Sequence, residues 1–222
     1  MVRLGRTVLI VCALLALAVS AQASTLSFPI TIFNTGVDAS GSPLPDGAIG
    51  DPHYSLVSLP GGTNTLVVRT SAGGFPIGPW IGDDSASAWI RPNNIGNLST
   101  DPEGDYDFQT TLDLSGLIPS TAVLIGQWAT DNEGLNILLN GNSTGNTAVG
   151  FTRWSSFTID SGFVAGVNTL DFLVHNDSGG YGNPVGLRVE ISGTADSTPE
   201  PATLMLIGAG LVALGMVRRR KA

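Results

Sequence analysis

The sequence predicts an all-β fold, an antiparallel β-sandwich that lies between two apolar terminal segments. Short apolar or alternating runs recur between clusters of Gly, Pro, Asn and Asp, and no run before Pro201 has the helical period of about 3.6 residues. The chain contains 29 Gly and 13 Pro residues and only 13% charged residues, a composition typical of short strands and frequent turns. Residues 24–194, between the two apolar segments, are long enough for one domain.

The clearest predicted strand covers residues 105–114, where apolar and polar side chains alternate strictly. This alternation indicates one buried face and one solvated face. Similar patterns predict further strands at 26–33, 54–59, 65–70, 88–91, 121–128, 135–140, 154–160, 170–174 and 185–191. Asn140-Gly141 follows an apolar run and predicts a hairpin turn. Strands at this spacing suggest two antiparallel sheets packed face to face.

The N-terminus has the three parts of a secretion signal. Arg3 and Arg6 form a basic start, residues 8–19 are apolar, and Ala21 and Ala23 are the small residues that a signal peptidase reads. We expect residues 1–23 to be a signal peptide, cleaved by signal peptidase before Ser24. The alternative is a membrane anchor, but 12 apolar residues fall short of the roughly 20 that span a bilayer.

The C-terminus has a second ordered set of features. A linker, residues 195–201, ends in Pro199-Glu200-Pro201, and residues 202–217 carry no charge. A helix of 16 residues spans about 24 Å, which is short for a bilayer core of about 30 Å, and snorkelling arginines can cover the difference. We therefore expect a transmembrane helix at 202–217. The basic tail 218–222 predicts a cytoplasmic end and an ectodomain outside, and contains Arg218, Arg219, Arg220 and Lys221.

This tail resembles the PEP-CTERM sorting signal of Gram-negative bacteria, which is also catalogued as an ice-binding protein C-terminal domain. The resemblance covers about the last 26 residues and rests on the Pro-Glu-Pro motif, the apolar segment and the arginine cluster in that order. It implies membrane anchoring facing the periplasm, cleavage by an exosortase, and then display at the cell surface or release into the exopolysaccharide matrix. The alternative is an ordinary tail anchor preceded by a proline-rich linker.

The middle of the chain resembles the galactose-binding-like jelly roll, over about residues 50–194. The matching segments are 128–132, 137–141 and 166–170, with Phe157 between the last two. The resemblance implies a jelly-roll sandwich of the kind used as accessory modules in glycosidases and on cell surfaces. It implies no particular function, because one fold serves many.

The predicted ectodomain is strongly acidic. Between Ser24 and Thr198 it has 4 arginines, no lysine and 17 acidic residues, which gives a net charge of −13 with His neutral. Such a surface repels phosphate backbones, so we expect no binding to nucleic acid. Cations, neutral sugars and other extracellular polymers, including exopolysaccharide, are better candidate partners.

Four acidic residues occur at alternate positions, Asp101, Glu103, Asp105 and Asp107. In an extended segment their carboxylates would project to one side, and calcium prefers several hard oxygen ligands. The sequence therefore suggests a possible structural calcium and no other cofactor. The alternative is an acidic loop that leads into a solvated strand face.

Trp128, Asp131 and Asn132 form a candidate sugar site, because sugar sites combine an aromatic platform with Asp and Asn hydrogen bonds. The alternative is that Trp128 fills the core and that the polar residues form a turn. Trp80, Trp89 and Trp154 are equally ambiguous from sequence alone.

Catalytic motifs are scarce. The expected mature chain contains His53 and His175, no cysteine because Cys12 leaves with the signal peptide, and no Gly-x-Ser-x-Gly motif. Asp83-Asp84-Ser85 has no histidine placed to complete a triad. We expect a non-catalytic surface or matrix protein. The alternatives are a carbohydrate-binding module with a defined glycan ligand and, third, a secreted esterase or glycosidase.

Overall fold

The computed structural model describes residues 26–61, 64–74, 76, 78–92, 101–179 and 182–198, together with 208, 210, 211, 215 and 219. The chain divides into two compact units. One unit is Ser27–Asp196, and the other combines Met1–Leu26 with Ser197–Ala222.

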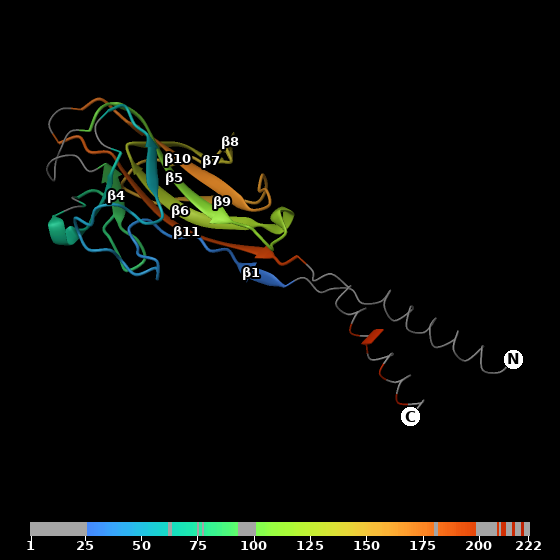
Figure 1. The fold of residues 1–222 in the computed structure, drawn as a ribbon. Helices are drawn as coiled ribbons and strands as arrows, with labels where there is room; N and C mark the ends of the chain where they lie inside the picture. Colours follow the sequence, from blue (N-terminus) through green and yellow to red (C-terminus); the bar gives the residue numbers. More distant parts are fainter. Residues whose placement is uncertain are drawn as a thin grey trace. The chain divides into compact units, whose positions relative to one another are not determined.

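The unit Ser27–Asp196 is a sandwich of two antiparallel sheets (Figure 1). The first sheet has the order β3-β4-β11-β6-β9, and β1 also pairs with β11. Its strands are β1 (Ser27–Pro29), β3 (Leu66–Arg69), β4 (Trp89–Pro92), β6 (Val123–Asp131), β9 (Ser155–Ile159) and β11 (Gly186–Asp196). The second sheet has the order β2-β5-β10-β7-β8. Its strands are β2 (Ser55–Ser58), β5 (Gly104–Asp113), β7 (Glu133–Leu139), β8 (Asn142–Ser143) and β10 (Val167–Asn176). The predicted all-β sandwich is confirmed.

Two short 3-10 helices, η1 (Ser71–Gly73) and η2 (Pro119–Thr121), lie in the connections. The hairpin predicted at Asn140-Gly141 joins β7 to β8, and both turn residues have positive φ, 52° and 76°. Two consecutive left-handed residues match the right-handed twist of the flanking strands, which explains the Asn-Gly pair.

The core lies between the sheets and is built from alternate residues of the long strands. Tyr106 and Phe108 of β5 are fully buried, as the alternation predicts. Phe172 of β10 stands near the centre, with its ring 5.6 Å from that of Trp128 and 6.2 Å from that of Phe157. Edge-to-face packing of this kind adds to the stabilisation by burial.

A smaller apolar cluster covers part of the opposite, outer side of the first sheet. Trp89 and Ala129 are buried there, and Trp80, Phe151 and Trp154 pack against them half-buried. The Trp80 ring is 4.5 Å from the Trp89 ring and 5.3 Å from the Phe151 ring. The first sheet is therefore covered on both sides at this point, while other parts of its outer face stay open.

Candidate functional site

The outer face of the first sheet carries a block of polar side chains from three adjacent strands. Glu190 of β11 pairs with Gln127 of β6, which pairs with Ser156 of β9. Two residues further along each strand, Ser192 pairs with Ile125 and Ile125 with Thr158. Because side chains alternate between the faces of a sheet, the five polar side chains and Ile125 all point to the same side. Their neighbours on the other side belong to the core.

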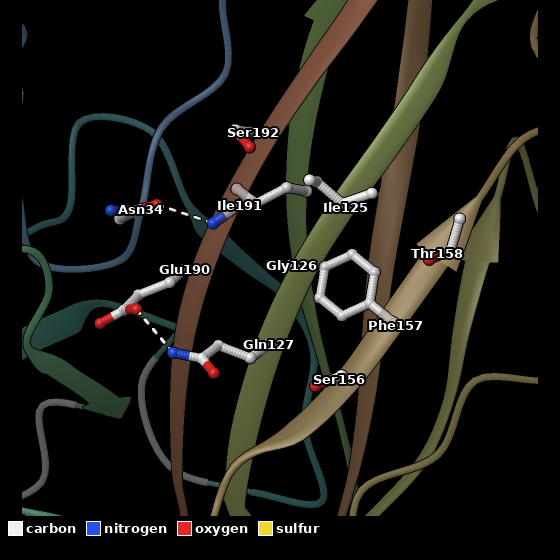
Figure 2. A pocket seen from close by; sticks show the side chains of 10 residues that line it. All are labelled: Asn34, Ile125, Gly126, Gln127, Ser156, Phe157, Thr158, Glu190, Ile191 and Ser192. Atoms are coloured by element: carbon white, nitrogen blue, oxygen red, sulfur yellow. Dashed lines mark hydrogen bonds between the residues drawn. The ribbon is translucent and has the colours of Figure 1, made fainter.

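These side chains line an open hollow of about 490 Å³, which we call the outer-face groove (Figure 2). Gly126 lies at its base, beside the ring of Phe157. A Cβ on Gly126 would lie 2.4 Å from the carbonyl oxygen of Glu190 and 2.5 Å from the Cζ of Phe157. Both distances are too short for a side chain, so glycine is required for this close packing.

Glu190, Gln127 and Asn34 are held in place in the groove by hydrogen bonds within the protein. Glu190 accepts one hydrogen bond from the Ser87 hydroxyl at 2.9 Å and another from Gln127 Nε2 at 2.8 Å. Asn34 accepts a hydrogen bond from the backbone N–H of Ile191 at 2.8 Å (Figure 2). Fixed polar groups lose little conformational entropy when a ligand binds.

Three hydroxyl groups along the groove remain available to a ligand. Ser156, Thr158 and Ser192 are exposed, and within the described part of the chain their side chains have no hydrogen-bond partner. A hydroxyl can both donate and accept. The groove therefore offers hydrogen bonds of both kinds to a hydroxylated ligand.

A buried arginine supports the carboxylate of the groove. Arg188 is fully buried. Its Nε donates to the Ser87 hydroxyl at 2.8 Å, and Nη2 lies 3.0 Å from Asp84 Oδ2 and 3.6 Å from Glu190 Oε1. Its Cζ stands 4.9 Å from the centre of the Trp154 ring, a cation–π contact. Arg188 thus contacts Glu190, the 84–87 loop and Trp154, and holds all three in fixed positions relative to one another.

Trp154 lies close to the groove along the chain. It precedes Ser156 by two positions, is half-buried and packs on the apolar cluster around Ala129. Sequence reasoning left Trp154 undecided among the four tryptophans. Only the pairing of β6 with β9 places it beside the groove.

Trp128, the predicted aromatic platform, lies in the core. It is fully buried between the sheets and packs on Phe172. Its position in β6 turns its ring inward, because Gln127 and Ala129 on either side point outward. The ring face is therefore not available to a sugar, and the alternative assignment of Trp128 to the core is the one that fits.

Asp131 and Asn132 lie at one end of the sandwich, where β6 leads into β7. Asp131 is only 4% exposed. Burial raises the pKa of Asp131 to about 7, with Asp177 and Asp101 adding to the shift against the opposing effect of Arg91. Asn132 Oδ1 accepts a hydrogen bond from the backbone N–H of Asp177 at 2.8 Å. These residues form the end of the sandwich rather than a site around Trp128.

The four carboxylates considered for calcium are dispersed. Asp101 is buried, with its Oδ2 2.6 Å from Arg91 Nη2 and accepting a hydrogen bond from the backbone N–H of Val185 at 2.9 Å. Asp101 therefore points inward and pairs with the guanidinium of Arg91. Glu103 and Asp105 are exposed.

Asp105 and Asp107 lie in different surroundings on the outer face of the second sheet. Asp105 Oδ1 lies 2.6 Å from His175 Nδ1, and this hydrogen bond raises the pKa of His175. Burial, followed by the neighbouring Asp171, raises the pKa of Asp107 to about 6. In the described ranges no three Asp, Glu, His or Cys side chains gather closely enough to hold a metal ion. The geometry therefore gives no support to the calcium prediction.

The predicted processing and sorting residues lie outside the described residues, except Arg219. They are Ala21, Ala23, Ser24, Pro199, Glu200, Pro201, Arg218 and Arg220. In the expected membrane segment 202–217, Gly208, Gly210, Leu211 and Gly215 are described, and all four are helical. Among the residues that the structure describes, no helix has the length and apolar character needed to cross a membrane.

Comparison with solved structures finds distant similarities, among them the following two. One is a CBM35 from Paenibacillus barcinonensis, with 15% identity and a TM-score of 0.34 over 66% of this chain and 98% of the other. The second is the isomalto-dextranase of Arthrobacter globiformis T6 complexed with panose, with 10% identity and a TM-score of 0.32 over 77% of this chain and 33% of the other. No curated protein matches the chain.

A family model for the PEP-CTERM protein-sorting motif matches residues 197–221. The match covers the Pro-Glu-Pro motif, the uncharged segment and the arginine cluster, which confirms the resemblance drawn from these residues. The motif implies export, processing by an exosortase and sorting to the cell surface. The chain therefore carries a PEP-CTERM sorting motif at its C-terminal end.

Proposed function

We propose that this protein is an exported, non-catalytic component of the bacterial cell surface or exopolysaccharide matrix. The observation that carries the proposal is the PEP-CTERM motif at residues 197–221. In this proposal, residues 1–23 direct export and are removed by signal peptidase. The 202–217 helix then holds the ectodomain at the membrane, facing the periplasm, until an exosortase cuts near Pro199–Pro201.

We further propose that the ectodomain is a jelly roll. The chain passes from β5 in the second sheet to β6 in the first and back to β7, and later from β9 through β10 to β11 in the same alternating way. Repeated crossing between two antiparallel sheets supports a jelly roll.

The composition of the outer-face groove supports a non-catalytic role. Glu190 is the carboxylate residue that lines it, together with amide, hydroxyl, aliphatic and aromatic side chains. Glycoside hydrolysis generally needs a pair of carboxyl groups on either side of the scissile bond. Glu190 is also engaged by Gln127 and Ser87, which suits a fixed binding group better than a proton donor.

The experiment that tests the sorting proposal is the intact mass of the protein recovered from native cell envelopes and from the medium. We expect a chain that begins at Ser24 and ends near Pro199–Pro201. A surface-exposed chain that keeps Arg218–Ala222 would contradict exosortase processing and leave an ordinary tail anchor. A chain that keeps residues 1–23 would contradict cleavage by signal peptidase.

A second candidate function, glycan binding, is favoured by the outer-face groove. Polar side chains from β6, β9 and β11 converge on it, and three exposed hydroxyls stand without partners in the described part of the chain. Sugars bind through such directed hydrogen bonds next to apolar surface. Ile125, 54% exposed, supplies apolar surface inside the groove.

The groove is tested by Gln127→Ala, with Gln109→Ala as a matched control. Both glutamines stand on outer sheet faces and donate to a carboxylate, Gln127 to Glu190 at 2.8 Å and Gln109 to Asp171 at 2.7 Å. We expect Gln127→Ala to weaken binding to a neutral polysaccharide about tenfold. The substitution removes the Gln127 amide from the groove and leaves Glu190 without the hydrogen bond that holds its carboxylate in place. Equal binding by the two variants in affinity electrophoresis would contradict the site.

A further inference from the structure

A second hollow, which we call the edge hollow, lies where the two sheets meet along one side of the sandwich. It has a volume of about 220 Å³. Both β8 and β9 are edge strands, each at the end of its sheet. The polar residues that line the hollow are Asn142, Ser143 and Thr144 on the β8 side and Thr158, Asp160 and Ser161 on the β9 side.

Thr158 lines both the edge hollow and the outer-face groove. The two hollows are therefore adjacent, one on each side of this residue. Neighbouring strands are about 4.8 Å apart, so a path from β11 across β6 to β9 covers about 10 Å before it turns into the edge hollow. The edge hollow therefore extends the path beyond the outer-face groove.

The two walls of the edge hollow differ in how their polar groups are engaged. On the β8 side, Ser143 accepts from Asn136 Nδ2 at 2.7 Å and Thr144 donates to the carbonyl of Ile137 at 2.7 Å. On the β9 side, Asp160 and Ser161 are exposed, and their side chains have no hydrogen-bond partner among the described residues. One wall is thus rigid and the other offers free hydrogen-bonding groups, as in the outer-face groove.

We infer that the outer-face groove and the edge hollow form one track that binds a linear, uncharged polysaccharide along its length. The inference rests on the glycan binding proposed above and adds the class of ligand. Hydroxyl, amide and carboxylate groups follow one another along the track, which suits a polymer with hydroxyls on every unit. Both hollows are open to solvent, so the polysaccharide can bind through the middle of its chain and does not need a free end.

The charge of the track disfavours anionic polymers. Glu190 and Asp160 are the charged residues that line the two hollows, and no Lys or Arg is among the described lining residues. Arg188, two residues from Glu190 on β11, is fully buried and already faces Asp84 and Glu190. A polyuronate would therefore meet two carboxylates and no available cation, which is unfavourable.

The test uses the full-length chain and neutral gluco-, xylo- and manno-oligosaccharides of increasing length, measured by isothermal titration calorimetry. We expect affinity for the preferred series to rise with length until the track is filled. Ser161→Trp blocks the edge hollow alone, so it should bind the longest oligosaccharide about tenfold more weakly, through two or so lost hydrogen bonds, and the shortest unchanged. Ser120→Trp is the matched control, because Ser120 is also exposed and lies outside both hollows.

Asp160→Ala is a second variant that adds no bulk, and we expect it to lose affinity only for the longer oligosaccharides. Affinity that does not depend on length, or equal binding by Ser161→Trp and Ser120→Trp, would overturn the extended track while leaving the groove in place. Tighter binding of oligogalacturonate than of every neutral series would overturn the ligand class. A wild-type chain that binds none of the neutral series would overturn the glycan-binding function together with the track.

Discussion

Arg188 is the residue on which the outer side of the first sheet depends most. A fully buried guanidinium contacts Asp84, Glu190, Ser87 and the Trp154 ring. We expect Arg188→Met to lower the free energy of unfolding by about 2 kcal/mol, because it leaves Asp84 and Glu190 without their cationic partner. Both carboxylates are partly exposed, so the loss is smaller than for a fully buried pair. Urea denaturation of the full-length chain measures the change.

The control for this substitution is Arg153→Met. Arg153 is exposed, so its replacement should change the free energy of unfolding by no more than about 0.5 kcal/mol. Equal effects of the two substitutions would contradict a structural role for Arg188.

Asp107 is predicted to make the domain less stable at alkaline pH. Burial and Asp171 raise its pKa to about 6 in the folded chain, against about 3.9 in an unfolded chain. The folded state holds this proton more tightly, so stability is full below pH about 4 and is lost as pH rises through about 6. Asp107→Asn should therefore raise the melting temperature at pH about 8 and leave it nearly unchanged at pH about 4.

For Asp107→Asn at pH about 8 we expect the free energy of unfolding to rise by about 1 kcal/mol and the melting temperature by about 2–4 °C. These values allow for solvent screening, because Asp107 is partly exposed. Asp113→Asn on the same strand is the control of opposite sign. Hydrogen bonds from Ser115 lower the pKa of Asp113, so its replacement should not stabilise the chain at alkaline pH. Circular dichroism at the two pH values would refute the prediction if Asp107→Asn showed no difference between them.

At the scale of elements, Gly134 allows β7 to pass close to β6 and to the 146–148 segment. Gly134 and Ala148 exchange backbone hydrogen bonds, at 2.9 and 3.2 Å. A Cβ on Gly134 would lie 2.5 Å from Trp128 Cη2 and 2.6 Å from the Ala148 Cβ. We therefore expect Gly134→Ala to destabilise the domain by about 1–3 kcal/mol in urea denaturation.

Gly82→Ala is the matched control, because a Cβ there meets no atom within 4 Å. It should be neutral or slightly stabilising, since alanine restricts the unfolded chain. A Gly134→Ala variant as stable as Gly82→Ala would contradict the prediction, because it would show that the residues around Trp128 can move to accommodate a Cβ at position 134 without loss of stability.

Long amphipathic strands were predictable, and short or irregular ones were not. β5, β10 and β11 each alternate over many residues and follow their predicted positions, with extensions at the ends. The predicted strand 26–33 shortens to β1, Ser27–Pro29, and the two-residue strand β8 was not predicted. Strands this short lack enough residues to show a period, and their existence depends on the neighbour with which they pair.

The candidate site escaped prediction for a related reason. The Glu190–Gln127 hydrogen bond joins residues 63 positions apart. Alternation separates the two faces of a strand, but it does not reveal which strands become neighbours or which outer faces stay uncovered. For the same reason Trp128 and Trp154 were indistinguishable in sequence, although one fills the core and the other flanks the groove.

At the scale of the whole molecule, we predict that removal of the Pro-Glu-Pro motif separates sorting from folding. The Pro199→Ala/Pro201→Ala variant should be exported but keep its arginine tail and stay in the membrane fraction, because an exosortase reads this motif. Intact mass and cell fractionation measure the outcome. A shift of the variant into the medium with normal trimming would contradict recognition through these prolines.

The class of fold and the sorting motif at the C-terminal end of the chain were both predictable from the sequence alone. Both depend on short stretches of sequence, because strand alternation spans a few residues and processing enzymes recognise sorting signals as short linear segments. Three outcomes could be seen only in the folded chain: Asp101 is buried beside Arg91, Trp128 belongs to the core, and Gln127, Ser156 and Glu190 line one open groove. Those outcomes depend on non-local strand pairing, which buries one face of each strand and leaves the other to be covered or exposed by segments far away in the chain.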